Sequence, residues 1–151
     1  MYRYLLAYGS NVGDKHAHLK YASSAMDQIR TSLRQSQWIE TPPLERPSHY
    51  PPSEVHENYL NFVEDCSSML EPVELYRFIA DIEDERGHNR DIPWAPRQLD
   101  IDIVLWAKND HDLLKDCTQL SQTEPLMIPH PGWKHRDFWT QLSSQIGAYF
   151  E

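Results

Sequence analysis

The strongest chemical signal in this chain is a pair of aspartates, Asp100 and Asp102, with an arginine, Arg97, just ahead of them. Alternate residues of an extended strand share a face, so the two carboxylates lie side by side and repel each other unless a cation lies between them. Oxygen ligands of this kind suit Mg²⁺, which binds one or two carboxylates and leaves its other positions to water and phosphates. The planar guanidinium of Arg97 matches phosphate oxygens. The segment therefore predicts metal-dependent chemistry on a nucleotide.

The residues around this pair predict the strand that positions it. Apolar and acidic side chains alternate over residues 99–103, and apolar residues continue to Trp106. As a strand, the segment places Leu99, Ile101, Ile103 and Leu105 on one face and the aspartates on the other. Taken alone, an Asp-x-Asp pair is more often a solvated strand face than a metal site, so the metal prediction depends on the motifs elsewhere in the chain.

The remaining elements follow from hydrophobic spacing and from the positions of glycine and proline. Strands are expected over residues 2–8, 36–41 and 59–65, and helices over 15–34, 72–86 and 138–149. A proline-rich stretch, 44–57, is expected to be a long functional loop. The order strand, helix, strand, strand, helix, strand predicts an α+β, ferredoxin-like (split β-α-β) fold. Its antiparallel sheet would carry the helices on one face and long substrate-binding loops.

Length, charge and cysteine content limit the class of protein. The 151 residues predict a single domain, 1–151, and the net charge of −9 argues against a general nucleic-acid or anionic-membrane surface. The apolar runs are too short to span a membrane, and the N-terminus does not resemble a secretory leader. Cys66 and Cys117 have no paired spacing, which is typical of a reduced compartment. We expect a cytoplasmic monomer with no nucleic-acid or membrane partner.

A longer series of short motifs runs through the chain. In order these are Gly9-Ser10-Asn11, Thr41-Pro42-Pro43-Leu44, Tyr59-Leu60-Asn61, Glu83, Gly87, Trp94, Pro96, Arg97, Asp100, Asp102, Pro129-His130-Pro131, Arg136 and Phe138. Each motif is weak alone, but in this order they are specific. The series, which covers Leu5 to about Phe138, resembles the hydroxymethyl-dihydropterin pyrophosphokinases of folate biosynthesis.

The resemblance implies a reaction and a phosphate site. The hydroxymethyl oxygen of 6-hydroxymethyl-7,8-dihydropterin would attack the β-phosphorus of ATP, so that pyrophosphate is transferred and AMP is released without a covalent enzyme intermediate. Mg²⁺ would be held by Asp100 and Asp102, with ATP as co-substrate. The resemblance places the phosphates and ribose of ATP near Arg90, Arg97, His130, Arg136 and Glu83.

The resemblance also implies a pterin site. Tyr59 and Phe138 would lie on the two faces of the ring, Asn61 would bond its amide-like edge, and Trp94 would help to close the site. Backbone groups around Thr41, Pro42 and Leu44 would complete the same edge.

The chain departs from the family pattern at His88, where an arginine is usual, and at His56, where glutamine is common; the 44–57 loop is also longer. Two functions therefore stay open. The first is an active pyrophosphokinase. The alternative is a low-activity paralogue that binds nucleotide or pterin, with an altered substrate or a non-catalytic role.

Simpler interpretations of the same residues also stay open. Tyr59 and Phe138 could also be core aromatics, His130 could be a turn residue between prolines, and Arg90 and Arg136 could be partners in surface ion pairs. RNA binding on an open ferredoxin-like sheet is disfavoured because the strand expected to bear it ends in acidic residues. An Asp-x-Asp sugar transferase would leave the motifs between residues 41 and 61 unexplained.

Overall fold

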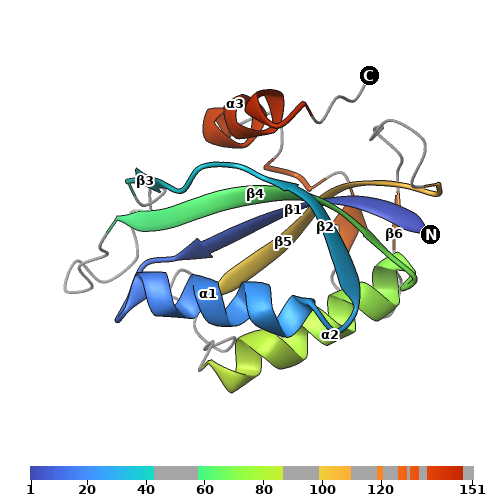
Figure 1. Ribbon diagram of the computed structural model, residues 1–151, viewed down its shortest axis with the longest axis horizontal. Coiled ribbons are helices and arrows are strands. Elements are labelled where there is room, and N and C mark those ends of the chain that lie inside the picture. Colours follow the sequence, from blue (N-terminus) through green and yellow to red (C-terminus); the bar gives the residue numbers. More distant parts are fainter. Residues whose placement is uncertain are drawn as a thin grey trace, which may run out of the picture.

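The structure, a computed structural model, describes residues 1–42, 58–86, 99–109, 119–120, 126–128, 130–132 and 136–147. Figure 1 shows a twisted sheet with α1 and α2 against one face and α3 against the other. The elements are β1 (Tyr2–Ser10), α1 (Lys15–Met26), β2 (Arg30–Gln35), β3 (Ile39–Thr41), β4 (Tyr59–Ser68), α2 (Pro72–Glu85), β5 (Asp100–Ala107), β6 (Gln119–Leu120), β7 (Met127–Ile128) and α3 (Asp137–Gln145). No helix in these ranges is long and apolar enough to cross a membrane.

The main sheet has the order β2-β4-β1-β5, and β3 also pairs with β4. All of these pairings are antiparallel. The two longest helices connect strands that are not neighbours, which is the split β-α-β arrangement. The predicted α+β, ferredoxin-like class is therefore confirmed.

Helices cover both faces of the sheet, whereas the sequence predicted them on one. On β1, Tyr4, Leu6 and Tyr8 belong to the hydrophobic cluster under α1 and α2. Leu5 and Ala7 belong to a second cluster, with Trp139, Leu142 and Ile146 of α3. The central strand is apolar on both faces, so each face needs its own cover.

The chain segment after α1 differs from the prediction. The expected helix over 15–34 ends at Met26, and Arg30–Gln35 form the strand β2 beside β4. Arg30 is buried and donates from Nε to Glu64 Oε1 on β4 (2.9 Å). Leu33, which the helical spacing placed in the core, is 48% exposed. The partner that turns this segment into a strand lies 34 residues away, so the local apolar spacing was misleading.

A β-bulge changes the facing of β5. Leu6 pairs with Ile103 and Leu5 with Leu105, which leaves Val104 as the additional residue. Ile101 and Ile103 lie under α1 and α2 as predicted, but Val104 and Leu105 both lie in the cluster under α3. The predicted position of Leu105 is therefore wrong. Up to Ile103 the odd-numbered residues face α1 and α2, but the additional residue at the bulge turns Leu105 to the α3 face.

Candidate active site

The two aspartates lie at the start of β5, on the sheet face that α3 covers. Asp100 pairs with Gly9 on β1, and Gly9 pairs in turn with Asn61 on β4. Neighbouring strands are about 4.8 Å apart, so Asn61 and Asp100 are separated by about 10 Å along this row. Gly9 contributes no side chain between them. The sheet therefore presents an amide and a carboxylate with a bare strip of backbone between.

Three of the residues predicted to bind pterin, Thr41, Tyr59 and Asn61, meet at this end of the sheet. β3 pairs with β4 so that Thr41 is opposite Tyr59. Asn61 is buried and donates from Nδ2 to Thr41 Oγ1 (2.7 Å) and more weakly to the Tyr59 carbonyl (3.3 Å). These contacts fix the orientation of the amide, with the Asn61 side chain toward Gly9. Pro42 follows and is exposed.

Two of the residues predicted to contact phosphate, His130 and Arg136, meet at Asp102. His130 Nε2 lies 3.5 Å from Asp102 Oδ1, and Arg136 Nη1 lies 3.8 Å from Asp102 Oδ2. All three side chains are 22–25% exposed, so they are accessible from solvent. Partly exposed ion pairs contribute little to stability. His130 and Arg136 can therefore exchange the Asp102 carboxylate for an anionic ligand at little cost to the stability of the fold.

The backbone fixes which nitrogen of His130 carries a proton. The Gly132 N–H donates to His130 Nδ1 at 2.9 Å. Nδ1 is therefore the acceptor, and in the neutral ring the proton lies on Nε2, which faces Asp102. The His130 N–H donates to the Val104 carbonyl at 3.0 Å, which anchors this turn to β5.

Trp139, which no sequence motif singled out, contacts both Arg136 and His130. The Arg136 guanidinium carbon lies 4.4 Å from the centre of the Trp139 ring. The His130 ring meets the indole edge-on, with centroids 5.0 Å apart and planes at 86°. Trp139 is 3% exposed and also meets the half-buried Phe138 in an edge-on contact. The spacing of Arg136 and Trp139, three apart at the start of a helix, was the signal available in the sequence.

Glu83 on α2 is buried on the other side of β5. Its Oε2 accepts the backbone N–H of Ile101 at 2.9 Å. Ile101 lies between Asp100 and Asp102, so this contact holds the strand segment that carries both carboxylates. The assignment of Glu83 to the ATP ribose stays a prediction.

Several predicted site residues fall outside the described ranges. These are Leu44, Arg90, Trp94 and Arg97, together with the departures His56 and His88. Their roles stay predictions.

The donor set at the start of β5 fits Mg²⁺. Among the described residues, no group of three or more His, Cys, Asp or Glu side chains forms a complete metal cage. Mg²⁺ does not need one, because it binds through one or two carboxylates and completes its shell with water and substrate phosphates. Asp100 and Asp102 supply the two carboxylates on one strand face.

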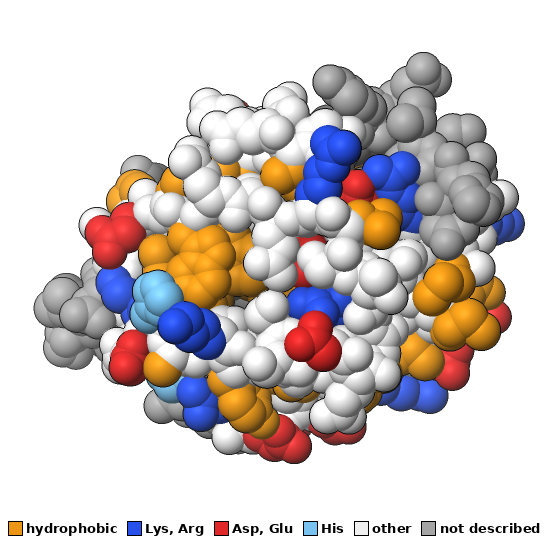
Figure 2. Space-filling model, in the orientation of Figure 1, with side chains coloured by type: hydrophobic (Ala, Val, Ile, Leu, Met, Phe, Trp, Pro, Cys, Tyr) orange, Lys and Arg blue, Asp and Glu red, His pale blue; other side chains and the backbone are white. Residues whose placement is uncertain are grey.

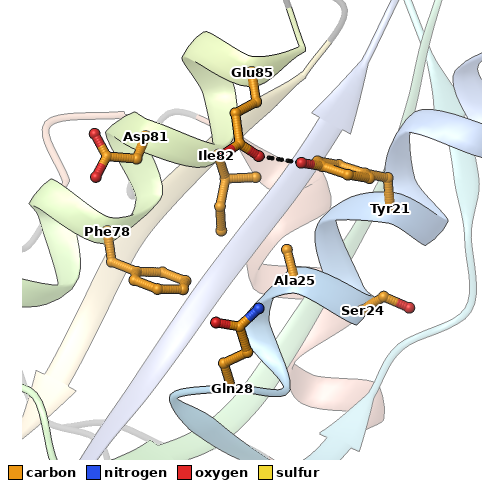
Figure 3. Close-up of a pocket in the computed structure, with 8 residues that line it drawn as sticks. All are labelled: Tyr21, Ser24, Ala25, Gln28, Phe78, Asp81, Ile82 and Glu85. Carbon is orange, nitrogen blue, oxygen red and sulfur yellow. Dashed lines mark hydrogen bonds between the residues drawn. The ribbon is translucent and has the colours of Figure 1, made fainter.

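A separate pocket of about 450 Å³ lies between α1 and α2 (Figure 3). It is lined by Tyr21, Ser24, Ala25, Gln28, Phe78, Asp81, Ile82 and Glu85. The Tyr21 hydroxyl donates to Glu85 across its mouth. This pocket is on the sheet face opposite the aspartates, and none of the predicted site residues lines it, so the candidate site is the α3 face.

Comparison with known proteins points to the same chemistry. Residues 5–147 match the family model for 7,8-dihydro-6-hydroxymethylpterin-pyrophosphokinase. A 2-amino-4-hydroxy-6-hydroxymethyldihydropteridine pyrophosphokinase of Bacillus subtilis is 30% identical over 135 residues, covering 88% of this chain and 71% of that protein. The protein of the same name from Aquifex aeolicus is 34% identical over 134 residues, covering 89% and 73%.

A larger relative is the folate synthesis bifunctional protein of Chlamydia trachomatis, which is 31% identical over 147 residues. The aligned region covers 95% of this chain but 30% of that protein. The resemblance drawn from the ordered motifs is thus confirmed over most of the chain. The chain belongs to the 7,8-dihydro-6-hydroxymethylpterin-pyrophosphokinase family.

Proposed function

We propose that the α3-facing end of the sheet is where this chain aligns ATP with its pterin substrate, with Mg²⁺ at Asp100 and Asp102. As a family member the chain is an ATP-dependent pyrophosphokinase, which transfers pyrophosphate to 6-hydroxymethyl-7,8-dihydropterin in folate biosynthesis. The observation that carries the assignment of the site is the position of the Asp102–His130–Arg136 group beside the Asn61–Thr41–Tyr59 group, on one sheet face.

Asn61 orients the pterin. Its amide is held by Thr41, so its remaining hydrogen-bonding capacity is directed at the amide-like edge of a flat ring. Tyr59 and Phe138 supply rings for stacking, and Thr41 and Pro42 border the same site. Leu44 and Trp94, outside the described residues, are expected to complete it. A ring held at Asn61 extends across Gly9, which directs its hydroxymethyl group toward the aspartates.

His130 and Arg136 hold the phosphates. The Nε2–H of His130 and the guanidinium of Arg136 are donors that face Asp102, and phosphate oxygens replace the carboxylate as acceptors when ATP enters. Mg²⁺, when bound, supplies positive charge that screens the phosphate oxygens from the approaching hydroxyl. We expect Arg90 and Arg97, which lie outside the described residues, to bind the phosphates as well, and we keep the ribose contact of the buried Glu83 as a prediction. Catalysis here is alignment and charge neutralisation.

The same proposal covers the setting in which the enzyme works. We take residues 1–151 as one domain, monomeric and cytoplasmic, with small-molecule substrates and no nucleic-acid or membrane partner. On the face shown in Figure 2, the described basic and acidic side chains are interspersed and do not gather into a basic patch. Among the described residues Cys66 is a free, buried thiol, which suits a reduced compartment.

The experiment is AMP formation from ATP and 6-hydroxymethyl-7,8-dihydropterin, measured with Mg²⁺ and with excess chelator. We expect AMP only with Mg²⁺. Asp100→Asn and Asp102→Asn should each lower kcat at least about a hundredfold, because each removes a charge that holds the metal and its phosphates. Asp81→Asn, on the opposite face, is the matched control and should retain full activity. Full activity in either site variant would show that the carboxylates do not hold the metal.

A further inference from the structure

We propose that Trp139 is a positioning residue for pyrophosphate transfer, in that its indole face holds the Arg136 guanidinium toward Asp102. The inference rests on the proposed phosphate role of Arg136. It adds a residue to the site that neither the Asp-x-Asp strand nor the pterin motifs contain.

Three contacts fix the guanidinium. Its carbon lies 4.4 Å from the centre of the Trp139 ring, within the range of a cation–π interaction. Its Nη1 lies 3.8 Å from Asp102 Oδ2. On the chain before α3, a Cβ at Gly132 would lie 2.8 Å from Arg136 Nε, so the guanidinium group lies directly against the Gly132 backbone. The side chain is thus held in one orientation before ATP binds.

The same indole also meets the second phosphate ligand. His130 contacts the ring edge-on, and its backbone is tied to β5 through Val104. Trp139 therefore lies under both donors that face Asp102. Its other surface packs in the cluster of Leu5, Ala7, Val63 and Leu142, which makes it a rigid platform.

Packing alone does not explain a tryptophan here. Leu142 and Ile146 fill the same cluster from the same helix with aliphatic side chains. A leucine at position 139 would also exclude water, but it would present no π face to Arg136. When a phosphate replaces Asp102 as the partner of Arg136, the indole keeps the guanidinium in place, so less side-chain freedom is lost on binding.

The test compares Trp139→Leu, Trp139→Phe and Leu142→Ala, each with its thermal midpoint recorded. We expect Trp139→Leu to lower kcat/KM for ATP about 3- to 30-fold, the range of a cation–π contact between exposed and desolvated sites. Trp139→Phe keeps an aromatic face and is the more conservative change should Trp139→Leu fail to fold. Its kcat/KM for ATP should lie between those of Trp139→Leu and the wild type. Leu142→Ala removes buried volume from the same helix but leaves the indole beside Arg136, so it should lower kcat/KM less than Trp139→Leu does. Equal losses in Trp139→Leu and Leu142→Ala would overturn the inference.

Two further measurements separate positioning from packing. In an Arg136→Ala background, Trp139→Leu should cost much less than in the wild type, because the group that it positions is gone; equal fold losses in both backgrounds would overturn the inference. In NMR spectra, the Arg136 Nε–H signal should carry a ring-current shift that Trp139→Leu abolishes and Leu142→Ala keeps. A signal unaffected by Trp139→Leu would overturn the inference as well.

The variants also distinguish this inference from the phosphate role beneath it. Full activity in Arg136→Ala would overturn the role of Arg136 and the inference with it. An impaired Arg136→Ala enzyme beside a fully active Trp139→Leu enzyme would overturn the inference alone.

Discussion

Gly9 controls the space between the pterin residues and the aspartates. An added Cβ would lie 3.1 Å from Asn61 Oδ1 and 3.4 Å from Tyr59 Cδ1, so the amide would have to move. We expect Gly9→Ala to raise KM for the pterin about three- to tenfold, the cost of one misplaced hydrogen bond. KM for ATP and the thermal midpoint should change little. Steady-state kinetics with each substrate varied in turn would measure this; an unchanged pterin KM would mean that the ring does not cross Gly9.

His18 predicts a pH dependence of stability. Burial, and then the charge of Arg86, lower the pKa of His18 in the folded protein. Below its unfolded pKa of about 6.5, the unfolded chain binds the proton first, so stability falls as pH decreases toward the folded pKa. Well above the unfolded pKa of about 6.5, His18 is neutral in both states and has no effect on stability. Urea unfolding at pH 7.5 and 5.5 should show a smaller loss of unfolding free energy in His18→Gln than in the wild type. Parallel losses would contradict the prediction.

At the residue scale the sequence identified candidate residues for the site but not all of their contacts. The motifs identified Asn61, Asp102, His130 and Arg136, and the structure brings the last three together. The Trp139 platform was not predicted because the expected helix began at residue 138, whereas α3 begins at Asp137 with Arg136 as its N-cap. Because Arg136 caps α3, Trp139 lies one helical turn after it and is brought against its guanidinium.

Among the elements, the strand β2 shows where local patterns fail. Apolar residues at helical spacing continue past the end of α1, but Arg30–Gln35 pair with β4 instead. The reason is a buried ion pair: the side chains of Arg30 and Glu64 are 2% and 0% exposed. Tyr8 and Gln35 also donate to the Glu64 carboxylate. The local spacing of apolar residues contains no information about Glu64, which lies 34 residues further along the chain.

This network predicts that Arg30→Met is strongly destabilising. The substitution keeps the buried volume but leaves Glu64 without its cation, which costs about 3 to 5 kcal/mol. Urea unfolding would measure the loss. The double variant Arg30→Met/Glu64→Gln should recover part of it, because the carboxamide has no charge to compensate. A loss below about 1 kcal/mol would show that the ion pair with Arg30 does not stabilise the fold in this way.

For the molecule as a whole, the sequence predicted the fold class but not the two-sided core. The unbroken apolar run from Tyr4 to Tyr8 was the available signal, since a strand buried on both faces does not alternate. The amphipathic pattern of α3 shows that one side of the helix is buried. It does not show which face of the sheet that side packs against, so the position of α3 could not be predicted. In the proposed site the α3 layer matters because Phe138 lies on α3 and Arg136 is its N-cap.

The two clusters share one sheet, so they should unfold together. β1 contributes Tyr4, Leu6 and Tyr8 to one side and Leu5 and Ala7 to the other, so losing either cluster exposes the central strand. Leu75→Ala under α2 and Leu142→Ala under α3 each empty a fully packed position and should cost about 2 to 5 kcal/mol. In both variants, the urea transitions followed by tryptophan fluorescence and by far-UV circular dichroism should coincide. An earlier fluorescence transition in Leu142→Ala would instead mean that α3 detaches from the sheet before the rest unfolds.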